Sequence, residues 1–220
     1  MSTNRTRQPG GRLESTRATR RRIVAAATTL LLSEGYHAMS VSALARAAGV
    51  SPQTVYNAIG GKADVLKLVH DILLAGDEEP IPMADRLEFR AMSDSRDRQS
   101  FIAAYARLCG LIYERVGPLL GSVLAQGAGS DPGLATFVAS TEAERRTDQT
   151  LALTTLEAVH GLPDGFPRDL FLDEVWCLTA PEVYDRLVRR CGWSHEAYVR
   201  WLEDVLVAAF ERASVRPSRW

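Results

Sequence analysis

Residues Val41–Lys62 read VSALARAAGVSPQTVYNAIGGK, and this stretch carries the most constrained local chemistry in the chain. Gly49 follows an apolar-periodic run and stands where a helix ends in the left-handed conformation, which glycine adopts at no steric cost. Ser51 is suited to cap a second helix, and Pro52 suits its first position because no backbone N–H is needed there. The stretch therefore predicts two short helices joined by a tight turn.

The second of these helices has two unlike faces. At about 100° per residue, Val55 and Ile59 fall on one side, and Gln53, Tyr56 and Asn57 fall on roughly the opposite side. A tight helix pair whose second helix packs on one face and presents amide and phenol groups on the other matches a helix-turn-helix reader of the DNA major groove. Taken alone, the turn is equally compatible with an ordinary helical hairpin whose polar face is solvated.

Three neighbouring features favour the DNA-binding interpretation. A helix precedes the pair, because Ile23 and Leu31 belong to an i, i+4, i+7, i+8 apolar pattern that Gly35 stops. Residues 1–70 carry a net charge of +7 and residues 71–220 a net charge of −8, so a basic end is joined to an acidic body. Lys62 follows two glycines at the start of another helix, where an ammonium and free N–H groups would converge on one anion.

The run MSVSALARAAGVSPQTVYNAIGGKADVL, from Met39 to Leu66, resembles the DNA-binding domain of the tetracycline-repressor-like (TetR) family of bacterial transcriptional regulators. The resemblance implies a homodimer that reads a palindromic operator in double-stranded DNA. It implies phosphate contacts by Thr54, Tyr56 and Lys62 and base-edge contacts by Gln53 and Asn57, and Ser42 and Pro52 complete the expected DNA-contacting set. Ala58 and Ile59 depart from the commoner family pattern of an aromatic residue or histidine followed by phenylalanine, so no base preference is carried over.

Composition and pattern predict a soluble, cytoplasmic, all-α protein. The chain has 220 residues, 46% hydrophobic and 24% charged, which suits one or two packed cores. Its longest apolar runs fall well short of the roughly 18–20 residues that span a bilayer, and the arginine-rich N-terminus lacks the apolar core of a secretory signal. Three widely spaced cysteines without a CxxC motif indicate neither a disulfide framework nor a zinc site. No metal or cofactor is expected.

We expect a flexible basic arm over residues 1–15, a helix-turn-helix domain over 16–75 and a helical ligand-binding and dimerisation domain over 77–220. Within the last, a helix from Gln99 is predicted to break at Gly117-Pro118, and Asp131-Pro132 to start a helix of more than 25 residues ending near His160. Thr179 and Glu182 are spaced as a capping box, and Ser194 as the cap of the final helix.

The family resemblance also assigns roles in the larger domain, and the stretch from Trp176 to Tyr184 resembles the C-terminal region of a subset of these regulators. It implies a cavity for a small-molecule effector and a dimer formed by the last two helices. Candidate cavity residues, each of which is also an ordinary core residue by type, are Phe101, Tyr105, Cys109, Leu124 and Trp176. Candidate dimer residues, which share an apolar stripe or precede it, are Tyr184, Tyr198, Trp201, Leu202, Val205 and Leu206.

Three other functions leave recognisable signs in a sequence or in its binding behaviour. The Gly60-Gly61-Lys62 segment lacks the upstream glycine, the following Ser or Thr and the preceding strand of a phosphate-binding loop, so an enzyme is disfavoured. A non-sequence-specific architectural DNA protein would bind with little discrimination between operator and random DNA, whereas a regulator discriminates by roughly 10³ or more. A redox sensor would use Cys109, Cys177 or Cys191.

Overall fold

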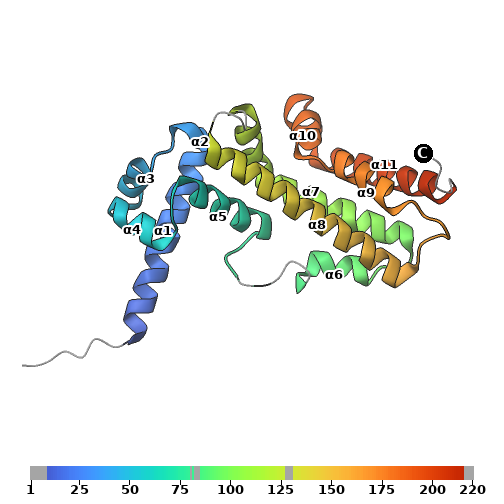
Figure 1. Cartoon of the computed structure of the whole chain (residues 1–220), viewed down its shortest axis with the longest axis horizontal. Coiled ribbons are helices and arrows are strands. Elements are labelled where there is room, and N and C mark those ends of the chain that lie inside the picture. The colour runs from blue at the N-terminus through green and yellow to red at the C-terminus, as the bar shows by residue number, and fades with distance from the viewer. Residues whose placement is uncertain (1–8, 80, 82–84, 127–130, 216–220) are drawn as a thin grey trace, which may run out of the picture.

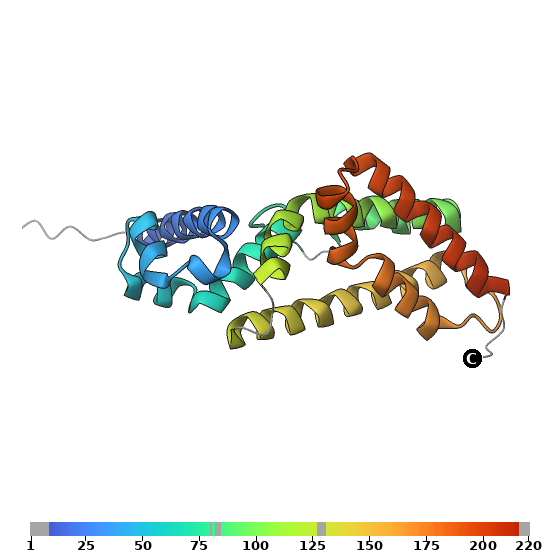
Figure 2. The same cartoon turned by 90° about the horizontal axis from the view of Figure 1, so that it is seen from above.

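The computed structural model describes residues 9–79, 81, 85–126 and 131–215, and over these residues the protein is all-α, with no strand. Figures 1 and 2 show an elongated molecule with α1–α5 at one end and α6–α11 at the other. The helices, in chain order, are α1 (Pro9–Ser33), α2 (Gly35–Ala38), α3 (Val41–Ala48), α4 (Pro52–Ala58), α5 (Lys62–Ala75), α6 (Leu87–Ser93), α7 (Arg98–Gln126), α8 (Pro132–His160), α9 (Arg168–Leu178), α10 (Pro181–Tyr184), the π-helix η3 (Asp185–Arg190) and α11 (His195–Val215).

The N-terminal helices enclose one apolar core. Ile23 and Leu31 of α1, Leu44 of α3, Val55 of α4 and Leu66 of α5 are all fully buried in it. Each lies on the apolar face of its helix, so the sequence periodicity directs these side chains into a common interior. The predicted three-helix arrangement of α1, α3 and α4 is present, with α5 packed against α1.

A second core lies among the C-terminal helices. The two longest helices, α7 and α8, run alongside each other, and α11 packs along α7 (Figure 2). The start signal at Asp131-Pro132 is confirmed, because the Asp131 carboxylate accepts the Leu134 N–H at 3.0 Å and α8 continues for 29 residues to His160. The Ser194 cap is confirmed as well, since its hydroxyl accepts the Ala197 N–H at 3.1 Å.

Three expectations from the sequence differ from the structure. Helix α7 passes through Pro118, so the predicted break there is wrong. A proline inside a helix removes one backbone hydrogen bond and bends the helix. Figure 2 shows α7 changing direction in its second half. The predicted capping box is also wrong, because the Thr179 hydroxyl donates to the Val175 carbonyl and Thr179 ends α9. Helix α1 already begins at Pro9, within the expected basic arm, whereas residues 1–8 lie outside the described residues.

The two ends of the molecule share packing at their junction. Leu119 and Val123 of α7, with Leu134 of α8, belong to the same core as α1–α5. The Tyr36 hydroxyl donates to the Asp131 carboxylate at 3.2 Å, and burial together with that carboxylate raises the pKa of Tyr36 to about 12. Helix α8 and the N-terminal helices are therefore joined through side chains in direct contact.

Candidate nucleic-acid interface and ligand cavity

Helix α4 is built as the sequence predicts. Gly49 has φ +65° and ends α3, and the Ser51 hydroxyl accepts the Thr54 N–H at 3.1 Å at the start of α4. Pro52 occupies the first turn, and Val55 faces the core with no exposed surface. These constraints fix the rotation of α4 about its own axis, and with it the identity of the residues that face outward.

The outward face of α4 is polar and accessible. Tyr56 is 54% exposed, and Gln53 and Asn57 are exposed beside it. The Gln53 amide donates to the Asn57 side-chain oxygen at 2.9 Å, which holds both amides on one face, one helical turn apart. Ser42, near the start of α3, is exposed as well, and α3 and α4 lie at the outer end of the molecule (Figure 1).

Lys62 lies beside this face but in a different environment from the expected one. Its ammonium donates to the His37 carbonyl at 3.2 Å and lies 4.2 Å from the centre of the Tyr36 ring. The Gly61 N–H is not free, because it donates to the Asp64 carboxylate at 2.8 Å. The Gly61 N–H at the start of α5 is thus occupied by a carboxylate and is not available to an anion beside Lys62.

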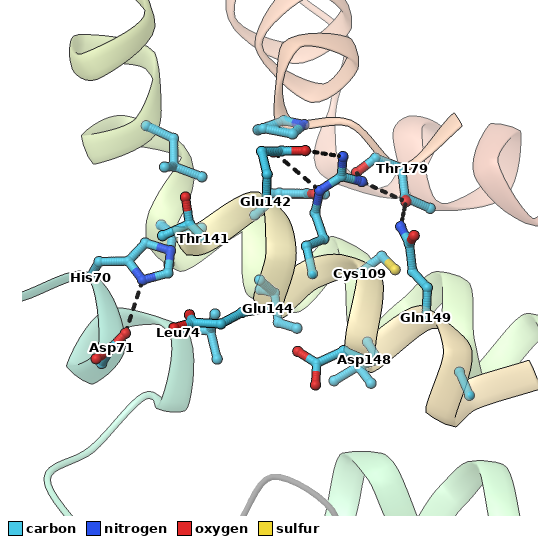
Figure 3. Close-up of a pocket in the computed structure, with 18 of the residues that line it drawn as sticks. His70, Asp71, Leu74, Cys109, Thr141, Glu142, Glu144, Asp148, Gln149 and Thr179 are labelled. Atoms are coloured by element: carbon cyan, nitrogen blue, oxygen red, sulfur yellow. Dashed lines mark hydrogen bonds and ion pairs between the residues drawn. The ribbon is translucent and has the colours of Figure 1, made fainter. Parts of the chain in front are cut away.

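The larger domain contains a cavity of about 360 Å³ between α5, α7 and α8 (Figure 3). One wall is apolar, and it includes Leu108, Ile112 and Val116 of α7. The opposite wall is polar and comes mainly from α8, where Figure 3 shows Glu142, Glu144, Asp148 and Gln149, with His70 and Asp71 reaching in from α5. A single ligand there would contact both ends of the molecule, because α5 also belongs to the core of α1–α5.

The five candidate cavity residues are not brought together by the fold. Tyr105 and Cys109 line the cavity. Phe101 lines a smaller neighbouring hollow, which Tyr105 also borders. Leu124 lines neither of them, and Trp176 is 39% exposed with its ring 5.2 Å from the Arg145 guanidinium.

The candidate dimer residues divide into two groups. Tyr184, Tyr198, Leu202 and Leu206 are buried in the core of their own chain, where Tyr184 and Tyr198 stack edge to face at 4.8 Å. Trp201 and Val205 are only half-buried. The accessible part of α11 is therefore rotated about the helix axis by about one residue from the predicted stripe. The Trp193 ring, 37% exposed and 6.3 Å from the Trp201 ring, lies next to it.

The cysteines are all free thiols, with Cys109 buried and the other two exposed. Burial raises the pKa of the Cys109 thiol to about 12, which suppresses the reactive thiolate at that position. Across the described residues, no cluster of His, Cys, Asp or Glu is arranged to hold a metal ion. None of the described helices combines the length and apolar character needed to cross a membrane.

The chain was compared with known protein families and solved structures. Residues 23–69 match the sequence pattern of the family described as bacterial regulatory proteins, tetR family. Those residues span the second part of α1, α2, the helix pair of α3 and α4, and the first half of α5. This match assigns residues 23–69 to the DNA-binding domain of the TetR family. No curated protein matches the chain by sequence.

Solved structures share the fold of this chain over nearly its whole length. The fatty acid degradation regulator FadR from Bacillus halodurans is 16% identical, with a TM-score of 0.62 over 92% of this chain and 96% of that one. A transcriptional regulator from Rhodococcus sp. Rha1 is 17% identical, with a TM-score of 0.59 over 90% and 99%. A protein described as a TetR-family regulator from Mesorhizobium loti is 19% identical, with a TM-score of 0.63 over 90% and 97%. At these identities the likeness is one of fold.

The most polar cavity residues of this chain were missed by sequence reasoning. Glu144, Asp148 and Gln149 come from the middle of α8, and Asp71 comes from α5. On α8 the available signal is spacing, because Glu144 and Asp148 are four residues apart and so share one face of the helix. A charged helix face normally indicates solvent, so the signal identifies a cavity only once α5 and α7 are in place.

Proposed function

We propose that this chain is a sequence-specific, DNA-binding transcriptional regulator that acts as a homodimer and is released from a palindromic operator by a small molecule. The observation that carries the proposal is the outward face of α4, where Gln53, Tyr56 and Asn57 are exposed on a helix whose rotation is fixed. Amide side chains can pair with adenine in the major groove, so Gln53 and Asn57 would read bases. Phosphate contacts by Thr54, Tyr56 and Lys62 would set the register.

A second copy of the chain is part of the proposal, because a palindrome is read by two α4 helices about 34–36 Å apart. The half-buried stripe of α11 that contains Trp201 and Val205 supports a partner at that helix, together with the exposed ring of Trp193. Such aromatic and aliphatic residues at the surface favour a self-complementary two-fold contact.

Release by an effector requires a ligand that binds the DNA-incompetent state more tightly than the DNA-bound state. The position of the cavity supports this step, because its ligand would contact His70 and Asp71 of α5 as well as α7 and α8. Since α5 packs against α1 in the N-terminal core, a shift of α5 would change the position of α4 relative to a partner's α4.

Selection of bound DNA from a random library by the full-length chain tests the proposal. We expect a palindrome with half-sites one helical turn apart and at least about 10³-fold preference over random DNA. The Gln53→Ala/Asn57→Ala variant should lose that preference while keeping salt-dependent binding. Uniform binding to all sequences would instead indicate an architectural protein, and a monomeric mass by light scattering at micromolar concentration would contradict the dimer.

A further inference from the structure

The polar wall of the cavity carries more negative than positive charge. Four carboxylates line it, from Asp71, Glu142, Glu144 and Asp148, whereas Arg145 is its only guanidinium among the described lining residues. Whether this excess is available to a ligand depends on which charges are already paired within the chain.

Arg145 is fully engaged by the protein itself. Its guanidinium donates to the Glu142 carboxylate at 2.8 Å and to the Trp176 carbonyl at 2.9 Å, and it lies over the Trp176 ring. These contacts tie α8 to the end of α9. Arg145 therefore does not offer a free cationic group to an anionic ligand.

Two of the remaining carboxylates share a single cation. The Lys67 ammonium lies 2.5 Å from the Asp71 carboxylate and 3.0 Å from that of Glu144. One positive charge opposes two negative charges, so the mouth of the cavity between α5 and α8 keeps a negative balance even with this bridge formed. The His70 imidazole contacts Asp71 at 3.1 Å and is otherwise buried against α8.

Asp148 adds a carboxylate at the rim, one helical turn from Glu144. Although the residue has exposed surface, burial of its carboxyl and the negative charge of Glu144 raise its pKa. No cationic side chain of the described residues forms an ion pair with it. Asp148 thus lies beside a like charge, and a ligand cation would oppose both charges.

The side-chain oxygen of the adjacent residue, Gln149, accepts no hydrogen bond within the described residues. Gln149 is only 3% exposed, and its amide N–H donates to the Thr179 hydroxyl at 2.8 Å. The Thr179 hydroxyl donates its own proton to the Val175 carbonyl at 2.7 Å, so toward Gln149 it can only accept. The Gln149 amide must therefore point its N–H group, and not its oxygen, at Thr179. The Gln149 Oε1, itself buried, is left without a partner among the described residues, and Gln149 is one of the residues that line the cavity (Figure 3). A buried acceptor in this state costs free energy unless a donor reaches it.

The opposite wall suits an apolar chain. Leu108, Ile112, Val116 and Leu120 line the cavity at intervals of four residues along α7. Side chains with this spacing form a continuous stripe on one helix face. An extended apolar body lying along this stripe would place its polar end against α8.

We infer that the cavity binds an amphipathic organic cation, an apolar molecule that carries a protonated amine. Its N–H groups donate to the Gln149 Oε1, its positive charge is opposed by Asp148 and Glu144, and its apolar body lies along the stripe of α7. The inference rests on the proposed function only in taking this cavity as the effector site. It also separates this chain from a receptor for a fatty-acid anion, since Arg145 is engaged and the unpaired charge is negative.

Isothermal titration of the full-length chain without DNA tests the ligand class, using three ten-carbon probes below their micelle concentrations. We expect decylammonium to bind most tightly and decyltrimethylammonium more weakly, because the latter has the charge but no N–H for Gln149. Decanoate should bind weakest. Decanoate binding as tightly as decylammonium would overturn the inference, as would the absence of decylammonium binding.

Variants locate the binding site. Asp148→Asn should weaken decylammonium binding by about tenfold or more, the scale of a lost charged hydrogen bond. Gln149→Leu should remove the preference for decylammonium over decyltrimethylammonium. Asp164→Asn, which removes an exposed carboxylate after the end of α8 that does not line the cavity, is the matched control and should leave affinity unchanged. Equal losses in Asp148→Asn and Asp164→Asn would show a non-specific charge effect and refute the site.

Failure of this inference is distinguishable from failure of the proposed function. If the library selects a palindrome but decanoate alone binds and releases it, the regulator stands and the ligand class is wrong. If decylammonium binds with the expected dependence on Asp148 but no DNA sequence is selected, the ligand class stands and the regulator does not.

Discussion

A buried polar cluster in the larger domain consists of Gln149, Thr179 and the Val175 carbonyl, with Thr179 at its centre. Replacing Thr179 by valine tests how much this cluster contributes to stability. Thr179 is 2% exposed, and its hydroxyl joins the Gln149 amide to the Val175 carbonyl. Valine keeps the shape of threonine and removes only the hydroxyl. The Val175 carbonyl still accepts the backbone N–H of residue 179 at 2.9 Å, so it remains paired.

The cost of Thr179→Val should therefore arise mainly at Gln149. Its amide N–H loses the acceptor at 2.8 Å while its Oε1 already lacks a partner, so both ends of a 97%-buried amide would be unpaired. One orphaned buried donor costs about 1–3 kcal/mol of unfolding free energy. For a chain of this size, about 2 kcal/mol corresponds to a Tm lower by roughly 4–8 °C.

A double-mutant cycle with Gln149→Leu isolates the bond, using urea unfolding followed by circular dichroism at one fixed protein concentration. The double variant should cost less than the sum of the singles by about 1 kcal/mol or more, because replacing both partners by apolar groups leaves no orphan. Thr154→Val is the matched control, since that hydroxyl lies on the exposed face of α8 and the change should stay within about 0.5 kcal/mol. Additive costs in the cycle would refute the reasoning.

Three further outcomes are expected. Lys62→Ala should weaken binding to all DNA sequences alike and lower the slope of log affinity against log salt by about one, and an unchanged slope in a salt titration would remove Lys62 from the contacts. Gly49→Ala should cost about 1–2 kcal/mol in urea unfolding because residue 49 has φ +65°, and Gly49→Asn should cost less; equal stability of all three proteins would contradict this. Val205→Arg should yield a monomer by light scattering with unchanged far-ultraviolet dichroism, and a retained dimer would exclude this face of α11.

The helix-turn-helix segment was predictable because its determinants are local. The positive φ of Gly49, the Ser51 cap and Pro52 in the first turn each depend on residues a few positions away. The polar face of α4 follows from helix geometry once Val55 faces inward. Sequence alone did not reveal that Asp64 occupies the Gly61 N–H, because any of several groups can cap the start of α5.

Elsewhere, tertiary packing decided between local alternatives. A proline ends some helices and bends others, and at Pro118 the helix continues because Leu119 and Val123 beyond it are buried in the core of α1–α5. A threonine at a helix junction suits a cap, but Thr179 is buried next to Gln149 and bonds there instead. On α11, periodicity identified an apolar stripe without showing how much of it the monomer itself would cover.

The cavity was beyond sequence reasoning because no single helix encodes it. Glu144, Asp148 and Gln149 look like a solvated helix face until the apolar stripe of α7 lies opposite them and Asp71 of α5 closes one side. The same residues join α5 to α8, since Lys67 bridges a carboxylate of α5 to one of α8. A cation that takes over Glu144 would compete with Lys67 for that bridge and loosen α5 from α8. The negative balance that would select the proposed cation is thus carried in part by Asp71 and Glu144, which also join α5 to α8 through Lys67.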